Sequence, residues 1–302
     1  MFFQQLVNGV SVGGIYALLA SGYALVYSLL GFSNWAHGEV AMAGAYIAWL
    51  CISFGSPAAA GAFHLPFPVA ALCAIAGAGL ISLLNERFFY RPIRERRSPT
   101  IFLMIAAMGL STVFQNGAML LFGAKFQRYP QLFPVLAIPL GSGAFSVRIG
   151  ALDLISLIVS AAALLSLDFL ITKTKFGLGV RAIASNSWTA DVLGINVNRI
   201  LAAVFFLSGA LAGAAGILLG LKYNVYPTMG NIGLKAFTAS VFGGLGSVRG
   251  AIVGALVIGV IEAFVSGYLN SSLRDLFTFS LLIVILLVKP SGLFGVNVEE
   301  KA

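Results

Sequence analysis

Residues 40–85 contain no Lys, Arg, Asp or Glu. Because a transmembrane helix needs only about 20 predominantly apolar residues, this interval alone has room for two such helices. Over the whole chain only 9% of the residues are charged and 59% are hydrophobic, whereas about 25% of the residues of an ordinary soluble domain are charged. So few charges cannot cover a soluble globule. The sequence therefore predicts an all-α polytopic membrane protein.

The N-terminal segment is expected to remain in the mature protein. No basic residue precedes Arg87, so residues 1–30 lack the positively charged n-region of a cleavable signal peptide and are predicted to form a first transmembrane helix. The apolar segments along the chain are Leu6–Leu30, Val40–Phe54, Phe67–Leu84, Thr100–Phe122, Leu152–Thr172, Ile200–Leu221, Leu234–Phe242, Ala251–Val265 and Leu276–Val288. They predict about nine crossings, with a range of about eight to ten.

Two of these segments, Val40–Phe54 and Leu234–Phe242, are too short to span a bilayer as simple helices. Gly31 and Gly38 precede the first, and a glycine-rich run over residues 243–250 follows the second. Short, glycine-interrupted apolar segments at corresponding places in two halves of a chain indicate broken helices at a transport site. We therefore expect two half-helix elements, related by an inverted repeat.

Two basic loops set the expected orientation. Glu86–Arg97 holds five arginines and Lys173–Arg199 holds four basic residues against one acidic residue, so the positive-inside rule places both in the cytoplasm. Gly123–Gly150, with Lys125, Arg128 and Arg148, is then external, the N-terminus periplasmic and the C-terminus cytoplasmic. Residues 1–302 are predicted to form a single permease domain. Its parts are a first half over about 1–125, a linker and extra helix over about 126–172, a cytoplasmic coupling loop over 173–199 and a second half over 200–290.

The first candidate site is the polar run that precedes Val40. Asn34, His37 and Glu39 lie in the apolar half of the chain, where polar side chains are costly and normally face the interior of a bundle or a wet cavity. A structural alternative is that His37 and Glu39 pair with one another near the inner boundary and lock a turn without contacting a solute.

The second candidate site follows Leu234. Thr238 and Ser240 carry hydroxyls that can bind a polar solute, and Gly243 and Gly244 allow the helix to break there. The alternative is that these hydroxyls bond to the backbone of their own helix. Lys235 is expected to extend to the membrane interface.

A short helix is predicted inside the second basic loop. Residues 185–187 offer Ser and Asn as N-caps, and Gly194 is suited to the C′ position. A helix of about two turns is not stable alone in water. It must therefore dock onto the bundle or onto a cytoplasmic partner.

The sequence also argues against several classes of protein. It has no GxxxxGK[ST] loop and no segment long enough for an ATPase domain, and its two histidines, His37 and His64, cannot make a multi-histidine metal site. Cys51 and Cys73 lie in apolar stretches and are expected to be buried thiols. The net charge of +8 lies mainly in loops between spans, which argues against a nucleic-acid partner. We expect no metal site, no cofactor and no enzymatic activity in this chain.

Several motifs together carry a family resemblance. Asn34-Trp-Ala-His-Gly-Glu39 resembles the Asn-(Phe/Leu)-Ala-His-Gly-Glu element of LivH-type permease subunits of bacterial branched-chain amino acid ABC importers. Further similar motifs follow in order at Glu86–Arg94, Gly109–Ser111, Gly179–Ala182, Leu193–Asn196, Lys235–Ala239, Gly243–Ser247 and Pro290–Gly295. The resemblance covers essentially the whole chain. Trp35 departs from it, since Phe or Leu is expected there, and this leaves the identity of the substrate open.

The resemblance implies an importer in the bacterial inner membrane, in which two permeases, identical or homologous, work with two cytoplasmic ATPases and a periplasmic binding protein. ATP is hydrolysed by the partner ATPases, and the solute is a branched-chain or other apolar amino acid. The implied coupling residues, within Gly179–Ile195, are Arg181, Ser187, Trp188, Asp191 and Gly194. The expected substrate path is lined by Asn34, His37, Glu39, Thr238, Ser240, Gly243 and Gly244.

Three other functions are compatible with the sequence. A stand-alone secondary transporter or channel for a small polar solute would also use an inverted repeat, although midplane Asp and Glu residues are scarce. An ABC permease for amides or urea would share the family motifs. An assembly or scaffold protein of the membrane would carry no flux.

Overall fold

The computed structural model describes residues 2–53, 65–130, 137–140, 147–289 and 291–295. His64 and Pro290, which entered the sequence argument, lie outside these ranges. Within the described residues, each apolar segment of the sequence lies on a helix. The main helices are α1 (Phe2–Leu30), α2 (His37–Ser53), α3 (Phe67–Asn85), α5 (Thr100–Phe122), α6 (Ala151–Lys173), α9 (Val197–Tyr223), α10 (Ile232–Gly243), α11 (Val248–Tyr268) and α12 (Arg274–Val288).

Shorter elements connect these helices. They are the π-helix η1 (Glu86–Tyr90), α4 (Arg91–Glu95), α7 (Lys175–Ser185), α8 (Ser187–Val192) and the 3₁₀ turns η3 (Met229–Asn231) and η4 (Ser271–Leu273). The strands β1 (Ala137–Leu140) and β2 (Val147–Gly150) form an antiparallel ribbon in which Ala137 faces Gly150. This ribbon is a small addition to an otherwise helical fold.

Seven helices of the described chain are long and apolar enough to cross a membrane, which confirms a polytopic α-helical membrane protein. The two main helices outside this set are α2 and α10, the segments that the sequence marks as too short. In α10 the reason is local, because Gly243 and Gly244 end the helix after 12 residues.

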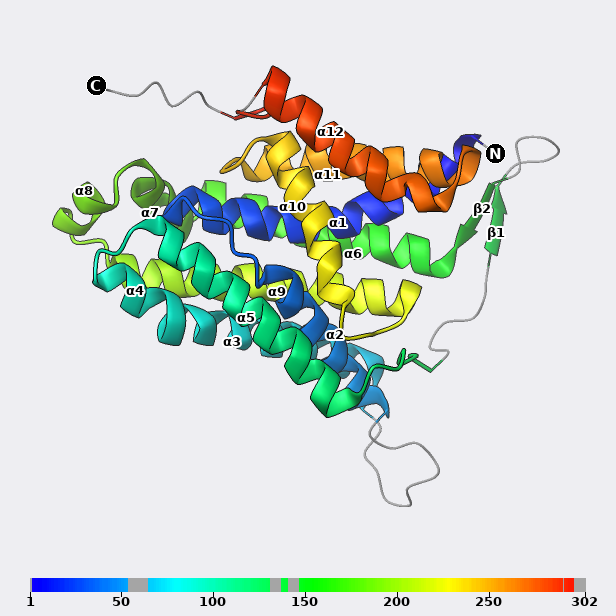
Figure 1. Ribbon diagram of the computed structural model, residues 1–302, viewed down its shortest axis with the longest axis horizontal. Helices are drawn as coiled ribbons and strands as arrows, with labels where there is room; N and C mark the ends of the chain where they lie inside the picture. Colours follow the sequence, from blue (N-terminus) through cyan, green and yellow to red (C-terminus); the bar gives the residue numbers. More distant parts are fainter. Residues whose placement is uncertain (1, 54–64, 131–136, 141–146, 290, 296–302) are drawn as a thin grey trace, which may run out of the picture.

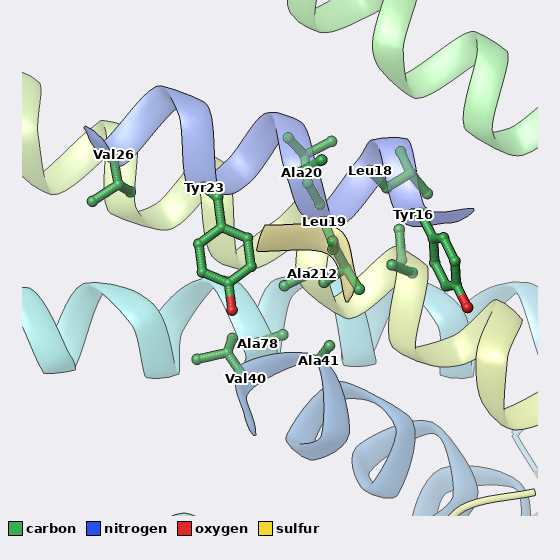
Figure 2. Packing of buried hydrophobic residues seen from close by; sticks show 14 of the residues in the cluster. Tyr16, Leu18, Leu19, Ala20, Tyr23, Val26, Val40, Ala41, Ala78 and Ala212 are labelled. Carbon is green, nitrogen blue, oxygen red and sulfur yellow. The ribbon is translucent and has the colours of Figure 1, made fainter. Parts of the chain in front are cut away.

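Helix α1 is the centre of the bundle. In its most apolar window 94% of the residues are buried, against 6% in the last span. It packs against α2, α6, α9, α10 and α11, and Figure 2 shows its side chains, Tyr16 and Tyr23 among them, over small residues such as Ala41, Ala78 and Ala212. Small residues let helix backbones approach where lipid removes the usual hydrophobic drive for association.

Glycine contacts make this close packing explicit. A Cβ on Gly13 would lie 2.9 Å from the Cα of Leu256 on α11. A Cβ on Gly216 of α9 would overlap the backbone of Ala41 on α2. The glycine spacing of the sequence therefore corresponds to helix packing in this fold, as expected for membrane bundles.

The outer surface carries the large apolar side chains. Leu72, Leu120 and Leu287 are 67%, 87% and 80% exposed, an arrangement that suits lipid and would be unfavourable in water. Cys51 is half-buried and Cys73 exposed. The expectation of a buried thiol is therefore wrong for Cys73, because apolar residues on the outside of a membrane bundle face lipid instead of a core.

The first basic segment, Glu86–Arg97, was expected to be a loop but is largely helical. Helix α3 continues through η1 into α4 and ends at Glu95, and the π-turn accommodates Pro92, which has no N–H to donate. Figure 1 shows α4, α7 and α8 gathered at one end of the bundle, and the N-terminus and the ribbon at the other. The two basic segments thus lie at the same end.

Candidate functional site: the junction of two broken helices

Asn34 organises the backbone between α1 and α2. Its Oδ1 accepts hydrogen bonds from the Ala36 N–H (3.2 Å) and the Tyr90 hydroxyl (2.7 Å), and its carbonyl oxygen accepts from the His37 N–H (3.0 Å). Asn34 is 3% exposed and Tyr90 is fully buried. The side-chain acceptor of this predicted path residue is therefore occupied by the protein itself, and Tyr90 of η1 ties the turn to α3.

His37 lies in the first turn of α2 and is 1% exposed. Its ring packs edge-on against Tyr23 with centroids 4.6 Å apart, and its Nδ1 lies 3.4 Å from the Ser208 hydroxyl. That hydroxyl donates to the Gly22 carbonyl oxygen over 3.2 Å. The ring fits only because position 22 has no side chain, since a Cβ there would lie 2.5 Å from His37 Nε2.

Glu39 is also in the first turn of α2 and is 3% exposed. Its Oε1 accepts a hydrogen bond from the Ser111 hydroxyl of α5 (3.2 Å), while its Oε2 is buried without a hydrogen-bond partner. The alternative in which His37 pairs with Glu39 is wrong, because in the described chain the two side chains have different neighbours.

The N-terminal turns of α2 and α10 meet beside this carboxylate. A Cβ on Gly38 would overlap the Gly230 carbonyl oxygen of η3, and a Cβ on Gly230 would overlap the Glu39 carboxylate. In Figure 1, α10 runs from this meeting point toward α11 and α12. Because helix N-termini carry partial positive charge, the junction electrostatically favours a carboxylate or another anionic group. We call this region, Asn34–Glu39 with Gly230–Gly233, the junction.

The second predicted element lies next to the junction through aromatic contacts. The Phe237 ring of α10 is 5.8 Å from that of Tyr23 and 6.1 Å from that of Trp35. The Thr238 hydroxyl donates to the Leu234 carbonyl oxygen over 2.9 Å, whereas the Ser240 hydroxyl is fully buried without a partner. Only Ser240 therefore has a free hydroxyl on this helix.

The predicted glycines of α10 serve its C-terminal end. A Cβ on Gly243 would overlap the Gly250 carbonyl oxygen of α11. Gly244 has φ +115°, a conformation that L side chains rarely adopt. The carbonyl oxygens of Phe242 and Gly243 accept from the N–H groups of Leu293 and Phe294 at 2.9 Å. This end of α10 is thus closed by backbone packing.

The short helix predicted in the second basic loop is α8. Asn186 is its N-cap and accepts the Thr189 N–H over 3.0 Å. At its end Gly194 has φ +84°, and the Gly194 and Ile195 N–H groups donate to the carbonyl oxygens of Asp191 and Ala190. This is the Schellman pattern of a glycine-terminated helix.

The side chains of α8 are exposed except that of Ala190, which is buried. Ser187, Trp188 and Asp191 are exposed, Trp188 to 74%. Arg181 of α7 has a role inside the chain, because its Nη1 donates to the carbonyl oxygens of Ile171 (2.7 Å) and Thr172 (3.2 Å) at the end of α6. It fixes the loop to the transmembrane bundle.

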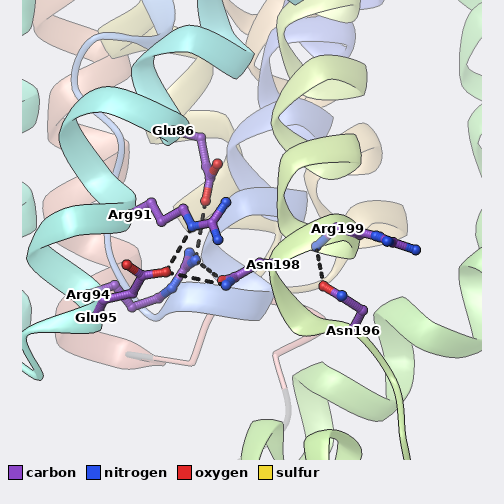
Figure 3. Close-up of polar contacts among 7 residues, drawn as sticks. All are labelled: Glu86, Arg91, Arg94, Glu95, Asn196, Asn198 and Arg199. Carbon is purple, nitrogen blue, oxygen red and sulfur yellow. Dashed lines mark hydrogen bonds and ion pairs between the residues drawn. The ribbon is translucent and has the colours of Figure 1, made fainter.

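The two basic segments are joined by a polar cluster, drawn in Figure 3. Arg94 donates to Glu86 (3.2 Å) and to Asn198 Oδ1 (2.6 Å), and Asn198 Nδ2 donates to Glu95 (3.3 Å). The cluster connects α4 to the first turn of α9, the helix that follows α7 and α8 in the chain.

The sequence did not predict a charged cluster that the structure forms away from the basic end of the bundle. Lys235 is 3.0 Å from Glu262 and 2.7 Å from Asp275, and the Tyr16 hydroxyl donates to Glu262 over 3.0 Å. Lys235 is thus ion-paired, a correction to the expectation that it extends to the interface alone. Glu262, the one acidic residue of α11, was the available sequence signal, since an ionisable residue within a span marks a functional candidate.

These features define a class of protein: a polytopic membrane bundle in which two broken helices meet at a buried polar junction, with a capped helix exposed at its basic end. The chain matches the family described as branched-chain amino acid transport system, permease component, over residues 5–286.

Named relatives agree with the family match over nearly full length. The chain is 39% identical to the LivH high-affinity branched-chain amino acid transport system permease protein of Salmonella typhimurium, covering 99% of this chain and 97% of that protein. It is 37% identical to BraD of Pseudomonas aeruginosa, a permease protein of the same description, covering 99% and 98%. A solved structure titled PsaBC from Streptococcus pneumoniae in complex with Fab aligns with TM-score 0.49 and 15% identity over 96% of this chain and 93% of that one.

The chain belongs to the family of permease components of branched-chain amino acid transport systems. It is accordingly a multi-pass membrane permease and not an enzyme.

Proposed function

We propose that this chain is the transmembrane subunit of an ATP-driven importer for branched-chain or other apolar amino acids. The observation that carries the proposal is the junction, where two helices break beside a buried carboxylate with an unpartnered oxygen. Broken helices at matching places supply backbone polar groups that replace part of a solute's hydration. The descriptions of the two relatives named above, both branched-chain amino acid permease proteins matched over nearly full length, support the choice of substrate.

The proposed path passes the junction and the buried hydroxyl of Ser240. Among the predicted path residues, His37, Glu39 and Ser240 each keep one buried polar atom without a partner, so these three residues are the candidates for solute contact. Asn34, Gly243 and Gly244 form the frame that keeps the helices broken.

The energy source in this proposal is ATP hydrolysed by partner subunits. Trp188, Val192 and Leu193 are 74%, 67% and 74% exposed, and exposed apolar side chains on a capped helix at the basic end suit insertion into a groove of a cytoplasmic ATPase. Two such ATPases, a second permease that is identical or homologous, and a periplasmic binding protein would complete the importer in the inner membrane. In this arrangement the basic end is cytoplasmic, the N-terminus is periplasmic and the C-terminus cytoplasmic.

Reconstitution tests the proposal. The chain is co-expressed with ABC ATPases, a second permease and a periplasmic binding protein of its own organism, and the complex is placed in proteoliposomes with ATP at the ATPase side. We expect accumulation of labelled leucine that requires ATP and the binding protein. Uptake by the permease alone under an ion gradient would instead indicate a secondary transporter, and uptake of urea or an amide but not of leucine would reject the substrate class.

A further inference from the structure

A second polar region of the molecule is unused by the path described above. It is a cavity of about 530 Å³. The first turn of α12, which lines it, lies away from α4 and α8 in Figure 1. The walls are contributed by α1, by the segment around Phe126, by the end of α9 and by the first turns of α10 and α12. Ligand cavities typically measure about 300–1,000 Å³ and combine apolar walls with a few polar groups. This volume therefore suffices for a single amino acid.

Two adjacent residues at the start of α12 bring opposite charges to this cavity. The Arg274 guanidinium donates to the Ser266 hydroxyl (2.6 Å), but within the described chain it has no ion-pair partner, and its Nε is buried without a hydrogen bond. Guanidinium groups match carboxylates through two parallel hydrogen bonds. Arg274 thus brings to the cavity a positive charge that no carboxylate of the described chain pairs with, and a solute carboxylate can neutralise it.

The neighbouring carboxylates differ in their availability. Glu262 is 4% exposed and already has three partners, because it accepts from Lys235, from the Tyr16 hydroxyl and from the Thr278 hydroxyl (2.9 Å). The Asp275 side chain contacts Lys235 but stays 66% exposed. Asp275 is therefore the carboxylate that can receive an ammonium group, and Lys235 with Glu262 holds it in place.

The remaining walls are apolar or aromatic. The rings of Phe126 and Tyr226, which both line the cavity, lie with their centroids 5.0 Å apart and their planes inclined at 58°. Ile232 adds an aliphatic surface beside them. An apolar side chain of a solute can replace water against these groups, whereas its charged groups would remain near Arg274 and Asp275.

The cavity adjoins the junction. Asn231 and Ile232 line it, and the preceding residue, Gly230, contacts the Glu39 carboxylate. The η3 turn thus separates the cavity from the broken-helix contact. A solute in the cavity lies directly before the proposed path.

We propose that this cavity binds a zwitterionic α-amino acid before it reaches the junction, with its carboxylate at Arg274, its ammonium at Asp275 and its apolar side chain against Phe126, Tyr226 and Ile232. The inference rests on the proposed function and deepens it, since it assigns a site to the substrate class.

The test is binding of labelled leucine to the complete permease–ATPase complex in nanodiscs without ATP or binding protein. Arg274→Gln is expected to raise the Kd by about 5- to 150-fold, the range for losing one hydrogen-bonded partner of a buried group. Asp275→Asn is expected to raise it as well. The matched control is Arg249→Gln, at the start of α11, where the arginine pairs with Asp168 (2.8 Å) at the other end of the bundle; its Kd should equal that of the parent.

Two further measurements keep the outcomes separate. Phe126 lies outside the helices, and Phe126→Ala should weaken the binding of leucine more than the binding of alanine. Isopentylamine and 4-methylpentanoate each lack one of the two charges of leucine, and both should compete poorly with it. An unchanged Kd in Arg274→Gln and in Phe126→Ala, with leucine uptake by the parent importer intact, would overturn the cavity but leave the proposed function standing. Failure of the parent importer to take up any apolar amino acid would reject the proposed function itself.

Discussion

The carboxylate of Glu39 lies directly against the Cα of Gly230, so that a Cβ at position 230 would overlap it. The contact joins the first turn of α2 to the turn that precedes α10. The two broken helices are therefore held together by an acidic side chain and a glycine that are distant in sequence.

Gly230→Ala is expected to push α2 and α10 apart. The added methyl must displace the Glu39 side chain or the η3 backbone, and overpacking of this kind typically costs about 1–3 kcal/mol. Thermal unfolding of the purified protein should show a lower Tm, with loss of uptake in the reconstituted importer. Gly109→Ala is the matched control, because a Cβ at Gly109 meets nothing within 4 Å. Equal Tm values for the two variants and the parent would contradict the contact.

A second glycine gives a double-mutant cycle. Gly22→Ala should destabilise the protein because its methyl would lie 2.5 Å from His37 Nε2. In a His37→Ala background the ring is gone and the same methyl fits. We expect the destabilisation by Gly22→Ala to be smaller there, with a coupling free energy of about 0.5–3 kcal/mol, the usual range for residues in contact. Additive effects on the free energy of unfolding would show that Gly22 does not accommodate the ring.

Much of the fold follows from local sequence signals. The apolar segments became helices whose ends differ from the segment ends by up to four residues. The α8 helix formed between Asn186 and Gly194 because cap residues act on neighbouring backbone groups. The broken character of α2 and α10 was likewise visible in their length and glycines. These features depend on residues within a few positions of one another.

Contacts between distant residues could not be predicted in this way. No sequence pattern predicts the hydrogen bond between Asn34 and Tyr90. The same is true of the ion pair between Lys235 and Glu262, which requires α10 and α11 to pack against one another. The expectation for Lys235 was wrong because its partners come from α11 and α12. Thr238 and Ser240 looked equivalent in sequence, and only the helix geometry distinguishes a hydroxyl bonded to Leu234 from one without a partner.

Coupling to the ATPases is expected to depend on the exposed face of α8. Asp191→Arg reverses the one acidic charge of the segment without touching the caps at Asn186 and Gly194. Membrane insertion and Tm should be unchanged, whereas stimulation of ATP hydrolysis by loaded binding protein should fall together with uptake. Asp191→Asn, which removes the charge without reversing it, should have a smaller effect. Parental uptake and parental ATPase stimulation in Asp191→Arg would exclude this face from coupling.

The orientation can be tested by thiol labelling in a background without Cys51 and Cys73. The labelled variants are Arg96→Cys and Trp188→Cys, at exposed positions of the basic end, and Lys125→Cys, in the segment predicted to be external. Arg94 is unsuitable because it bonds to Glu86 and Asn198. A membrane-impermeant reagent applied to intact cells should label position 125 and spare positions 96 and 188. The reverse labelling pattern would show that the basic end is external and would contradict the predicted orientation.

The proposed path is tested most cleanly at Ser240. Its hydroxyl is buried without a partner, and an unsatisfied buried hydroxyl costs free energy, so Ser240→Ala should leave Tm unchanged or raise it. If the hydroxyl contacts the solute during transport, uptake should still fall, by about 5- to 150-fold for one lost hydrogen bond to a buried group. Thr238→Val is the comparison, because that hydroxyl is already bonded to the Leu234 carbonyl oxygen, and its uptake should stay close to that of the parent. The measurements are initial uptake rates in proteoliposomes containing equal amounts of assembled complex. A Ser240→Ala variant that is as stable as the parent and transports at the parental rate would place the path away from this face of α10.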